Sequence, residues 1–106
     1  MVVLKDRDNN LVKLFLADTF FARLKGLFSS RAKCYDGIVI KPCNSVHTIG
    51  FMRKIDVIFL SADGKVIKVV HSMKPNRFAW CSGSRSVVEI FSDKRCYFSV
   101  GDVLHV

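Results

Sequence analysis

The sequence has no apolar run long enough to cross a membrane. Its longest nearly apolar stretch, residues 55–62, contains Asp56 and is far shorter than the roughly 18 to 20 residues that a transmembrane helix needs. The first residues place charged side chains directly after Val2, Val3 and Leu4, so they lack the apolar core and cleavage site of a secretion signal. For the sequence as given we therefore expect a cytoplasmic protein with no transmembrane segment.

Paired cysteines are missing as well. The four cysteines stand singly with no C-x-x-C pair, which excludes the ligand spacing typical of zinc knuckles and redox dithiols. A chain that is 50% hydrophobic does not need disulfides to hold a small core together. We predict buried or half-buried free thiols at Cys34, Cys43, Cys81 and Cys96, and neither a cofactor nor a resident metal.

Acidic residues are scarce. The 106 residues contain 9 Asp and Glu against 17 Lys and Arg, which gives a formal net charge of +8. A positive field of this size attracts polyanions in general, although a basic surface that serves only solubility would give the same composition. The length suits one domain, residues 1–106, and leaves no room for a second core.

Short runs of β-branched and aromatic residues, separated by turn residues, recur along the chain and predict strands. The expected strands are residues 2–4, 11–16, 38–40, 56–61, 66–70, 87–91, 97–100 and 103–106. Asp63-Gly64 joins the fourth and fifth in a hairpin, and residues 56–61 are apolar on both faces, as in a central strand. Asp18 or Thr19 as a cap and Gly26 as a terminator predict one short helix. We expect a mainly β domain, a compact sandwich or barrel of seven or eight strands with one short N-terminal helix.

Several motifs together resemble the signature of a prokaryotic family, domain of unknown function 192. They are RLKGL at residues 23–27, CNSVHT at 43–48, IDVIFL at 55–60 and DGKV at 63–66, and the match continues in order to Gly101-Asp102. The resemblance implies a compact β-rich fold of sandwich type and no established activity. Many members carry a secretion leader that this chain lacks, and the family often has a Met-Arg-aromatic-Pro run after His-Thr where this chain has Met52-Arg53-Lys54.

Residues 43–54 are predicted to form an irregular connection, and together with Asp56 just after them they carry the sharpest group of reactive residues. Cys43, His47 and Asp56 are the types found in a nucleophile, base and orienter arrangement, and they could equally form part of a metal or ligand pocket. On a straight strand Cys43 and His47 would lie roughly 13 Å apart, so catalysis requires a turn. The alternative is structural: His47 and Thr48 bond backbone groups, Cys43 packs, and Asp56 braces a turn.

A second unusual segment, residues 68–85, combines basic and aromatic side chains in a loop-like composition. It contains Lys68, Lys74, Arg77 and Arg85 with Phe78 and Trp80 interleaved, and no acidic residue. Such a loop could hold phosphates while its rings stack on bases, or contact a protein partner. It could also be solvated charge with the two rings folded back onto the core.

From these patterns we predict a non-enzymatic binding or accessory domain. It would present the His47/Asp56 segment and the basic-aromatic loop 68–85 to a small-molecule ligand or a protein partner. Two alternatives stay open: an enzyme or metal pocket built on Cys43, His47 and Asp56, and weak nucleic-acid binding through the basic surface. The predicted binding residues are His47, Thr48, Met52, Asp56, Arg77 and Trp80.

Overall fold

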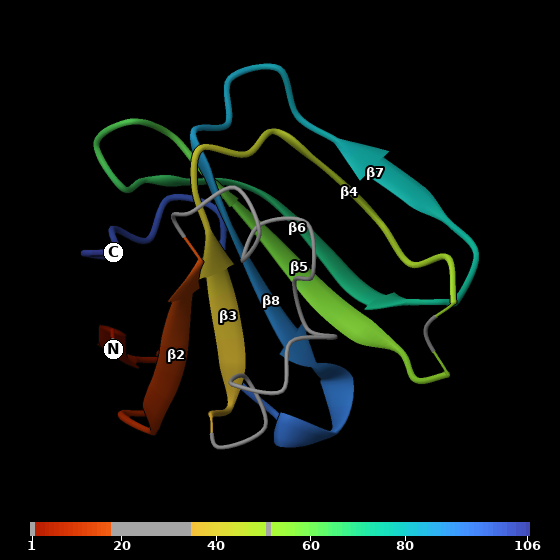
Figure 1. Cartoon of the computed structure of the whole chain (residues 1–106). Coiled ribbons are helices and arrows are strands. Elements are labelled where there is room, and N and C mark those ends of the chain that lie inside the picture. The colour runs from red at the N-terminus through yellow and green to blue at the C-terminus, as the bar shows by residue number, and fades with distance from the viewer. Residues whose placement is uncertain (1, 18–34, 51) are drawn as a thin grey trace.

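The computed structural model describes residues 2–17, 35–50 and 52–106 of the chain (Figure 1). Eight strands make up most of the regular structure in these ranges. They are β1 (Val2–Lys5), β2 (Leu11–Ala17), β3 (Gly37–Ile40), β4 (Ser45–His47), β5 (Ile55–Leu60), β6 (Val66–Met73), β7 (Phe78–Trp80) and β8 (Ser86–Phe91). A short 3₁₀ helix, Ser92–Lys94, follows β8.

The strands form two sheets. Six of them pair in the order β1-β2-β3-β8-β5-β6, and β4 and β7 form a separate two-stranded sheet. All neighbours in the large sheet are antiparallel except β2 and β3, which are parallel. In Figure 1 the β4–β7 pair lies across the β5 and β6 end of the large sheet. We call this pair the ribbon.

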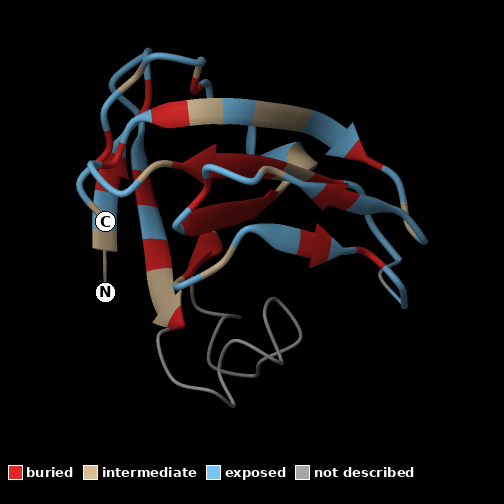
Figure 2. Cartoon of the chain, turned by 90° about the horizontal axis from the view of Figure 1, so that it is seen from above, coloured by how far each residue is buried: buried red, intermediate tan, exposed pale blue. Residues whose placement is uncertain are grey.

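Each face of the large sheet carries its own apolar cluster. One cluster joins side chains of β1, β2, β5 and β8 to Phe98 and Leu104 of the C-terminal segment. The other joins Ile55, Val57 and Phe59 of β5 to Val46 and Ala79 of the ribbon. Figure 2 shows the strands in the middle of the molecule buried along most of their length. The ribbon is therefore held in place by burial of its inner side chains against β5.

The mainly β prediction is confirmed, and so are six of the expected strands. The central position of β5 is confirmed because it pairs with β6 on one side and β8 on the other. The hairpin turn at Asp63-Gly64 is also present, with Gly64 at a φ of +84° that favours glycine. The helix expected near residues 18–25 lies outside the described residues.

Two parts of the strand prediction are wrong. Residues 97–100 and 103–106 do not form strands; apart from one bridge between Lys65 and Val103, they run as an irregular segment. Their apolar residues Phe98 and Leu104 cover one face of the large sheet, so the apolar pattern reflects burial over a face rather than pairing at an edge. Conversely, β4 and β7 form inside the two segments predicted as irregular or loop.

Candidate functional site

The ribbon sorts its side chains by strand alternation. Val46 pairs with Ala79 at its centre, and both are buried in the cluster over β5. The residues on either side of this pair, Ser45 and His47 on β4 and Phe78 and Trp80 on β7, are all exposed. Successive side chains of a strand point to opposite faces, so these four side chains share the outer face of the ribbon.

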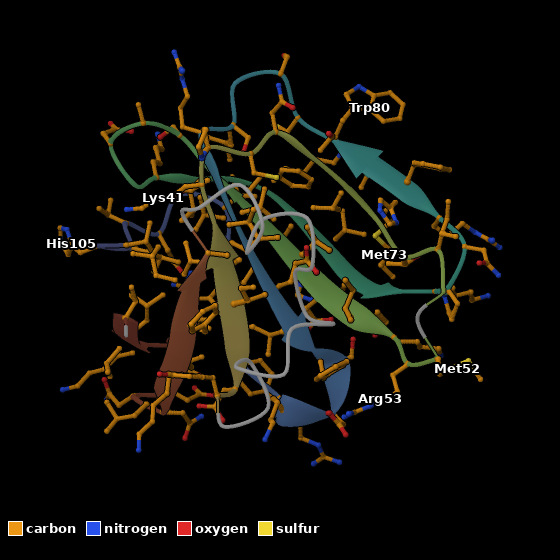
Figure 3. All side chains as sticks on the ribbon, in the orientation of Figure 1. Lys41, Met52, Arg53, Met73, Trp80 and His105 are labelled. Carbon is orange, nitrogen blue, oxygen red and sulfur yellow. The ribbon has the colours of Figure 1, made fainter. Side chains whose placement is uncertain are left out.

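Two large aromatic rings stand on this outer face. Trp80 is 68% exposed and Phe78 is 67% exposed, and Figure 3 shows the Trp80 ring at the periphery of the molecule beside β7. The ring of His47 lies 6.3 Å from that of Phe78, centroid to centroid, at an interplanar angle of 52°. The prediction left open whether Trp80 and Phe78 fold back onto the core; in the structure both are open to solvent.

Lysine and backbone groups frame the Trp80 end of the ribbon. The Lys68 amino group, on β6, donates a hydrogen bond of 2.9 Å to the carbonyl oxygen of Trp80. The same amino group lies 5.9 Å from the centre of the Trp80 ring, within the range of a cation–π contact. A positive charge is thus held beside the exposed indole.

The other end of the ribbon opens onto a hollow of about 340 Å³ beside β6. Its lining includes His71, Lys74 and Arg77 together with the ring of Phe78. All four of these residues are exposed. No acidic residue is among those that line the hollow. We use the name ribbon surface for the exposed rings of His47, Phe78 and Trp80 together with Lys68 and the basic residues of the hollow.

Thr48, a predicted binding residue, instead holds the end of the ribbon together. It is fully buried, and its hydroxyl donates to the carbonyl of Lys74 at 2.7 Å and accepts the amide of Arg77 at 2.9 Å. The Thr48 carbonyl also accepts the amide of Asn76 at 3.1 Å. These bonds fix the turn that carries Lys74 and Arg77, so Thr48 positions the site without facing it.

Asp56, like Thr48, forms hydrogen bonds within the protein itself. One carboxylate oxygen, Oδ1, accepts the Ser72 amide and the Ser92 hydroxyl, both at 2.8 Å. Ser72 has a φ of 51°, an uncommon conformation for a residue other than glycine, and Asp56 secures its backbone. Met52 is 92% exposed and lies at the periphery of the molecule in Figure 3, next to Arg53.

The residues proposed for nucleophilic catalysis have separate partners. The Cys43 thiol donates to the carbonyl of Ser45 at 3.1 Å, the Asp56 carboxylate is bound as above, and the imidazole of His47 lies beside Phe78. Among the described residues no group of three or more His, Cys, Asp and Glu side chains could hold a metal ion. Each of these three side chains thus has a contact of its own.

Two of the cysteines match the prediction of buried or half-buried free thiols. Cys81 and Cys96 are half-buried free thiols, while Cys34 lies outside the described residues. Burial, aided by the negative charge of nearby Asp6, raises the pKa of the Cys96 thiol to about 11, which makes it a poor nucleophile.

Within the ranges that the structure describes, no helix has the length and apolar character needed to cross a bilayer.

Charge is unevenly distributed along the chain. Residues 37–55 and 64–88 contain eight of the 17 lysines and arginines and none of the nine acidic residues. The nine cations that remain equal the nine acids in number. The whole net charge of +8 therefore arises in the two stretches that include the ribbon and β6.

Sequence reasoning found Trp80 and Arg77 but missed the role of Phe78 as the partner of Trp80 on one strand face. The alternation in Phe78-Ala79-Trp80 was the available signal, because a small residue between two rings is typical of a strand with one buried face. The serine-rich and glycine-containing residues that follow concealed so short a strand.

The fold and surface define a small, mainly β domain in which a two-stranded ribbon with an aromatic and basic outer face packs on the β5 and β6 end of a six-stranded sheet. The chain belongs to the family DUF192 (Uncharacterized ACR, COG1430), which it matches over residues 2–104. This confirms the resemblance inferred from the motifs.

Two crystal structures have a similar fold. A protein of unknown function from Novosphingobium aromaticivorans superimposes with a TM-score of 0.77 at 20% identity, over 99% of this chain and 83% of that one. A putative transcription regulator from Sinorhizobium meliloti gives a TM-score of 0.75 at 18% identity, over 98% of this chain and 90% of that one. No curated protein matches the sequence. At these identities the likeness extends to the fold alone.

Proposed function

We propose that this protein is a non-enzymatic binding domain whose ribbon surface holds an anionic ligand or protein partner. The observation that carries the proposal is the exposure of Phe78 and Trp80 on the same side of a strand whose middle residue, Ala79, is buried. Large exposed aromatic side chains that a rigid scaffold holds together are typical of interaction surfaces.

The basic groups around the rings specify the charge of the partner. Lys68 lies at one end of the ribbon surface, and His71, Lys74 and Arg77 lie at the other. Because no acidic side chain occurs between Gly64 and Val88, nothing in this stretch neutralises them. An anionic partner would gain both electrostatic attraction and contact with the rings.

The surface is also well anchored. Thr48 ties the turn that carries Lys74 and Arg77 to the end of β4, and the buried side chains of Val46 and Ala79 attach the ribbon to β5. A binding surface that is rigid before contact loses little conformational entropy on binding. His47 contributes a third ring, whereas Asp56 and Met52 contribute no direct contact to this surface.

Titration of the ¹⁵N-labelled protein with heparin, used as a generic polyanion, tests the proposal. Amide shifts should concentrate in β4, β7 and residues 68–77, and acrylamide should quench Trp80 fluorescence strongly before heparin is added and weakly afterwards. Trp80→Ala should weaken heparin binding, whereas Tyr97→Ala, which removes a 51% exposed ring elsewhere, should not. Shifts spread evenly over all basic residues, or an indole that acrylamide cannot reach, would overturn the proposal.

A further inference from the structure

The positions of Phe78 and Trp80 constrain what kind of anion fits the ribbon surface. The two residues are two apart on β7, so their side chains are separated by roughly 6.6 Å along the strand at about 3.3 Å per residue. Stacked nucleotides rise about 3.4 Å per step in one DNA strand. Two neighbouring bases could each contact one ring only if they were unstacked from one another.

A duplex does not meet this condition, because its bases are stacked and paired inside the helix. A flexible single strand does, since its bases can separate and turn their faces toward protein rings. Aromatic side chains combined with cations that follow the backbone are the usual means by which proteins bind single strands with little sequence preference. The ribbon surface has both parts.

The cations are placed to meet phosphates on either side of the rings. Lys68 lies 5.9 Å from the centre of the Trp80 ring, and Lys74 and Arg77 line the hollow beside Phe78. The guanidinium of Arg77 contacts the carbonyls of Pro75 and Asn76 at 3.4 and 3.3 Å. No carboxylate forms an ion pair with these three side chains among the described residues.

An acidic peptide would use these positive charges but gains less from the rings. Carboxylate side chains have no flat apolar face to lay on an indole, whereas every nucleobase does. The His47 ring, 6.3 Å from that of Phe78, extends the aromatic surface across to β4. The geometry therefore favours a nucleic acid over an acidic polypeptide.

We propose that the ribbon surface binds single-stranded nucleic acid, with bases on Trp80 and Phe78 and phosphates at Lys68, Lys74 and Arg77. This inference rests on the proposed function and adds the chemical class of the partner. With about three phosphate contacts, the logarithm of the association constant should fall with the logarithm of salt concentration at a slope of roughly −2.

Fluorescence anisotropy of labelled dT15 and rU15 with the full chain tests the inference. Wild type should bind both at low salt with the slope given above, and a duplex of the same length should bind more weakly. Trp80→Ala should reduce affinity about tenfold or more, and Trp80→Phe should restore part of it because a ring remains. Tyr97→Ala should bind like wild type.

Variants that remove basic side chains test the proposed phosphate contacts. The double variant Lys74→Gln/Arg77→Gln should lower the affinity and make the salt slope shallower, by about 0.7 for each lost phosphate contact. Lys5→Gln/Lys13→Gln is the matched control: it removes the same charge from exposed positions on β1 and β2 and should change the affinity less and leave the slope unchanged. Circular dichroism melts establish that each variant is folded.

Three results would contradict the inference, and they differ in what they imply for the proposed function. If poly-L-glutamate binds and depends on Trp80, but dT15 and rU15 do not, the ribbon surface is a binding site and the nucleic-acid inference is wrong. If the oligonucleotides bind Trp80→Ala and Lys74→Gln/Arg77→Gln as tightly as they bind wild type, the inference is also wrong. If none of the polyanions binds at low salt, both proposals fail.

Discussion

Thr48 and Arg77 are hydrogen-bonded in both directions: the Thr48 amide donates to the Arg77 carbonyl at 2.9 Å, and the Arg77 amide donates to the Thr48 side-chain hydroxyl oxygen at 2.9 Å. The hydroxyl itself donates a hydrogen bond of 2.7 Å to the Lys74 carbonyl. One buried side chain thus organises the turn that supplies the basic end of the ribbon surface.

Thr48→Val should therefore destabilise the protein although valine has nearly the same shape. The change leaves the Arg77 amide and the Lys74 carbonyl without the hydroxyl, and each unsatisfied buried group costs about 1 to 3 kcal/mol. Urea denaturation measures the loss in the free energy of unfolding. Thr48→Ser keeps the hydroxyl and should lose clearly less; equal losses for the two variants would contradict this account.

Asp56→Ala should destabilise the protein by about 1 to 3 kcal/mol, because the Ser72 amide and the Ser92 hydroxyl lose their common acceptor. The matched control is Asp93→Ala. Asp93 accepts a 2.7 Å bond from Arg53 at an exposed position, and exposed ion pairs contribute at most about 1 kcal/mol. Thermal melts of both variants decide the point, and an Asp93 effect as large as that of Asp56 would refute it.

Glu89 makes the stability of the fold depend on pH. It is buried on the central strand β8 between Ile38 and Val57 of the adjacent strands, and no described residue bonds its Oε2. Burial raises the pKa of its carboxyl from 4.5 to about 7. The unfolded chain therefore releases this proton at lower pH than the folded chain does, so ionisation favours unfolding.

Below pH 4.5 the carboxyl is protonated in both states and costs nothing. Between about pH 4.5 and 7 the free energy of unfolding should fall by about 3 kcal/mol as the pH rises, and above pH 7 this loss should level off. Urea denaturation at pH 5, 6, 7 and 8 measures the slope. Glu89→Gln cannot ionise and should flatten the slope; a parallel decline in the variant would show that another group is responsible.

Gly37→Ala should be strongly destabilising. A Cβ atom there would lie 2.3 Å from the Glu89 carbonyl oxygen and 2.9 Å from the Ile90 side chain, and β3 and β8 are paired through this position. Steric overlap of this kind costs about 1 to 3 kcal/mol or more. Gly83→Ala is the control, since its nearest contact would be an ordinary 3.5 Å; thermal melts in which both variants match wild type would contradict the prediction.

The strand content could be predicted because it depends on local pattern. The runs that became β5 and β8 are apolar except for Asp56 and Glu89 within them and Ser86 at the start of β8, and turn residues bound them, so local sequence was sufficient to identify them. The ribbon was harder: β4 and β7 have three residues each, too few for alternation to stand out. They are stabilised by pairing across some thirty residues of sequence and by the buried contacts of Val46 and Ala79.

Only part of the candidate site could be predicted, because residue type is visible in the sequence whereas partners distant along the chain are not. Trp80, Arg77 and His47 were identified from residue type, and the structure brings Trp80 and His47 onto one face of the ribbon. For Thr48 and Asp56, residue type alone left ligand contact and a structural role both open, since a hydroxyl or a carboxylate can serve a ligand or the protein's own backbone equally well. Their partners, Arg77 for Thr48 and Ser72 for Asp56, lie far away in sequence.

By itself the sequence determined that this chain forms many short strands, carries an excess of positive charge and belongs among the members of one family. Those properties are set by residue type and local order. Only the tertiary structure decided that Trp80 is exposed and that Glu89 is enclosed. Both outcomes depend on which faces of the strands pack against each other. That packing is set by pairing between residues distant in sequence, because the favoured arrangement removes the most apolar area from water.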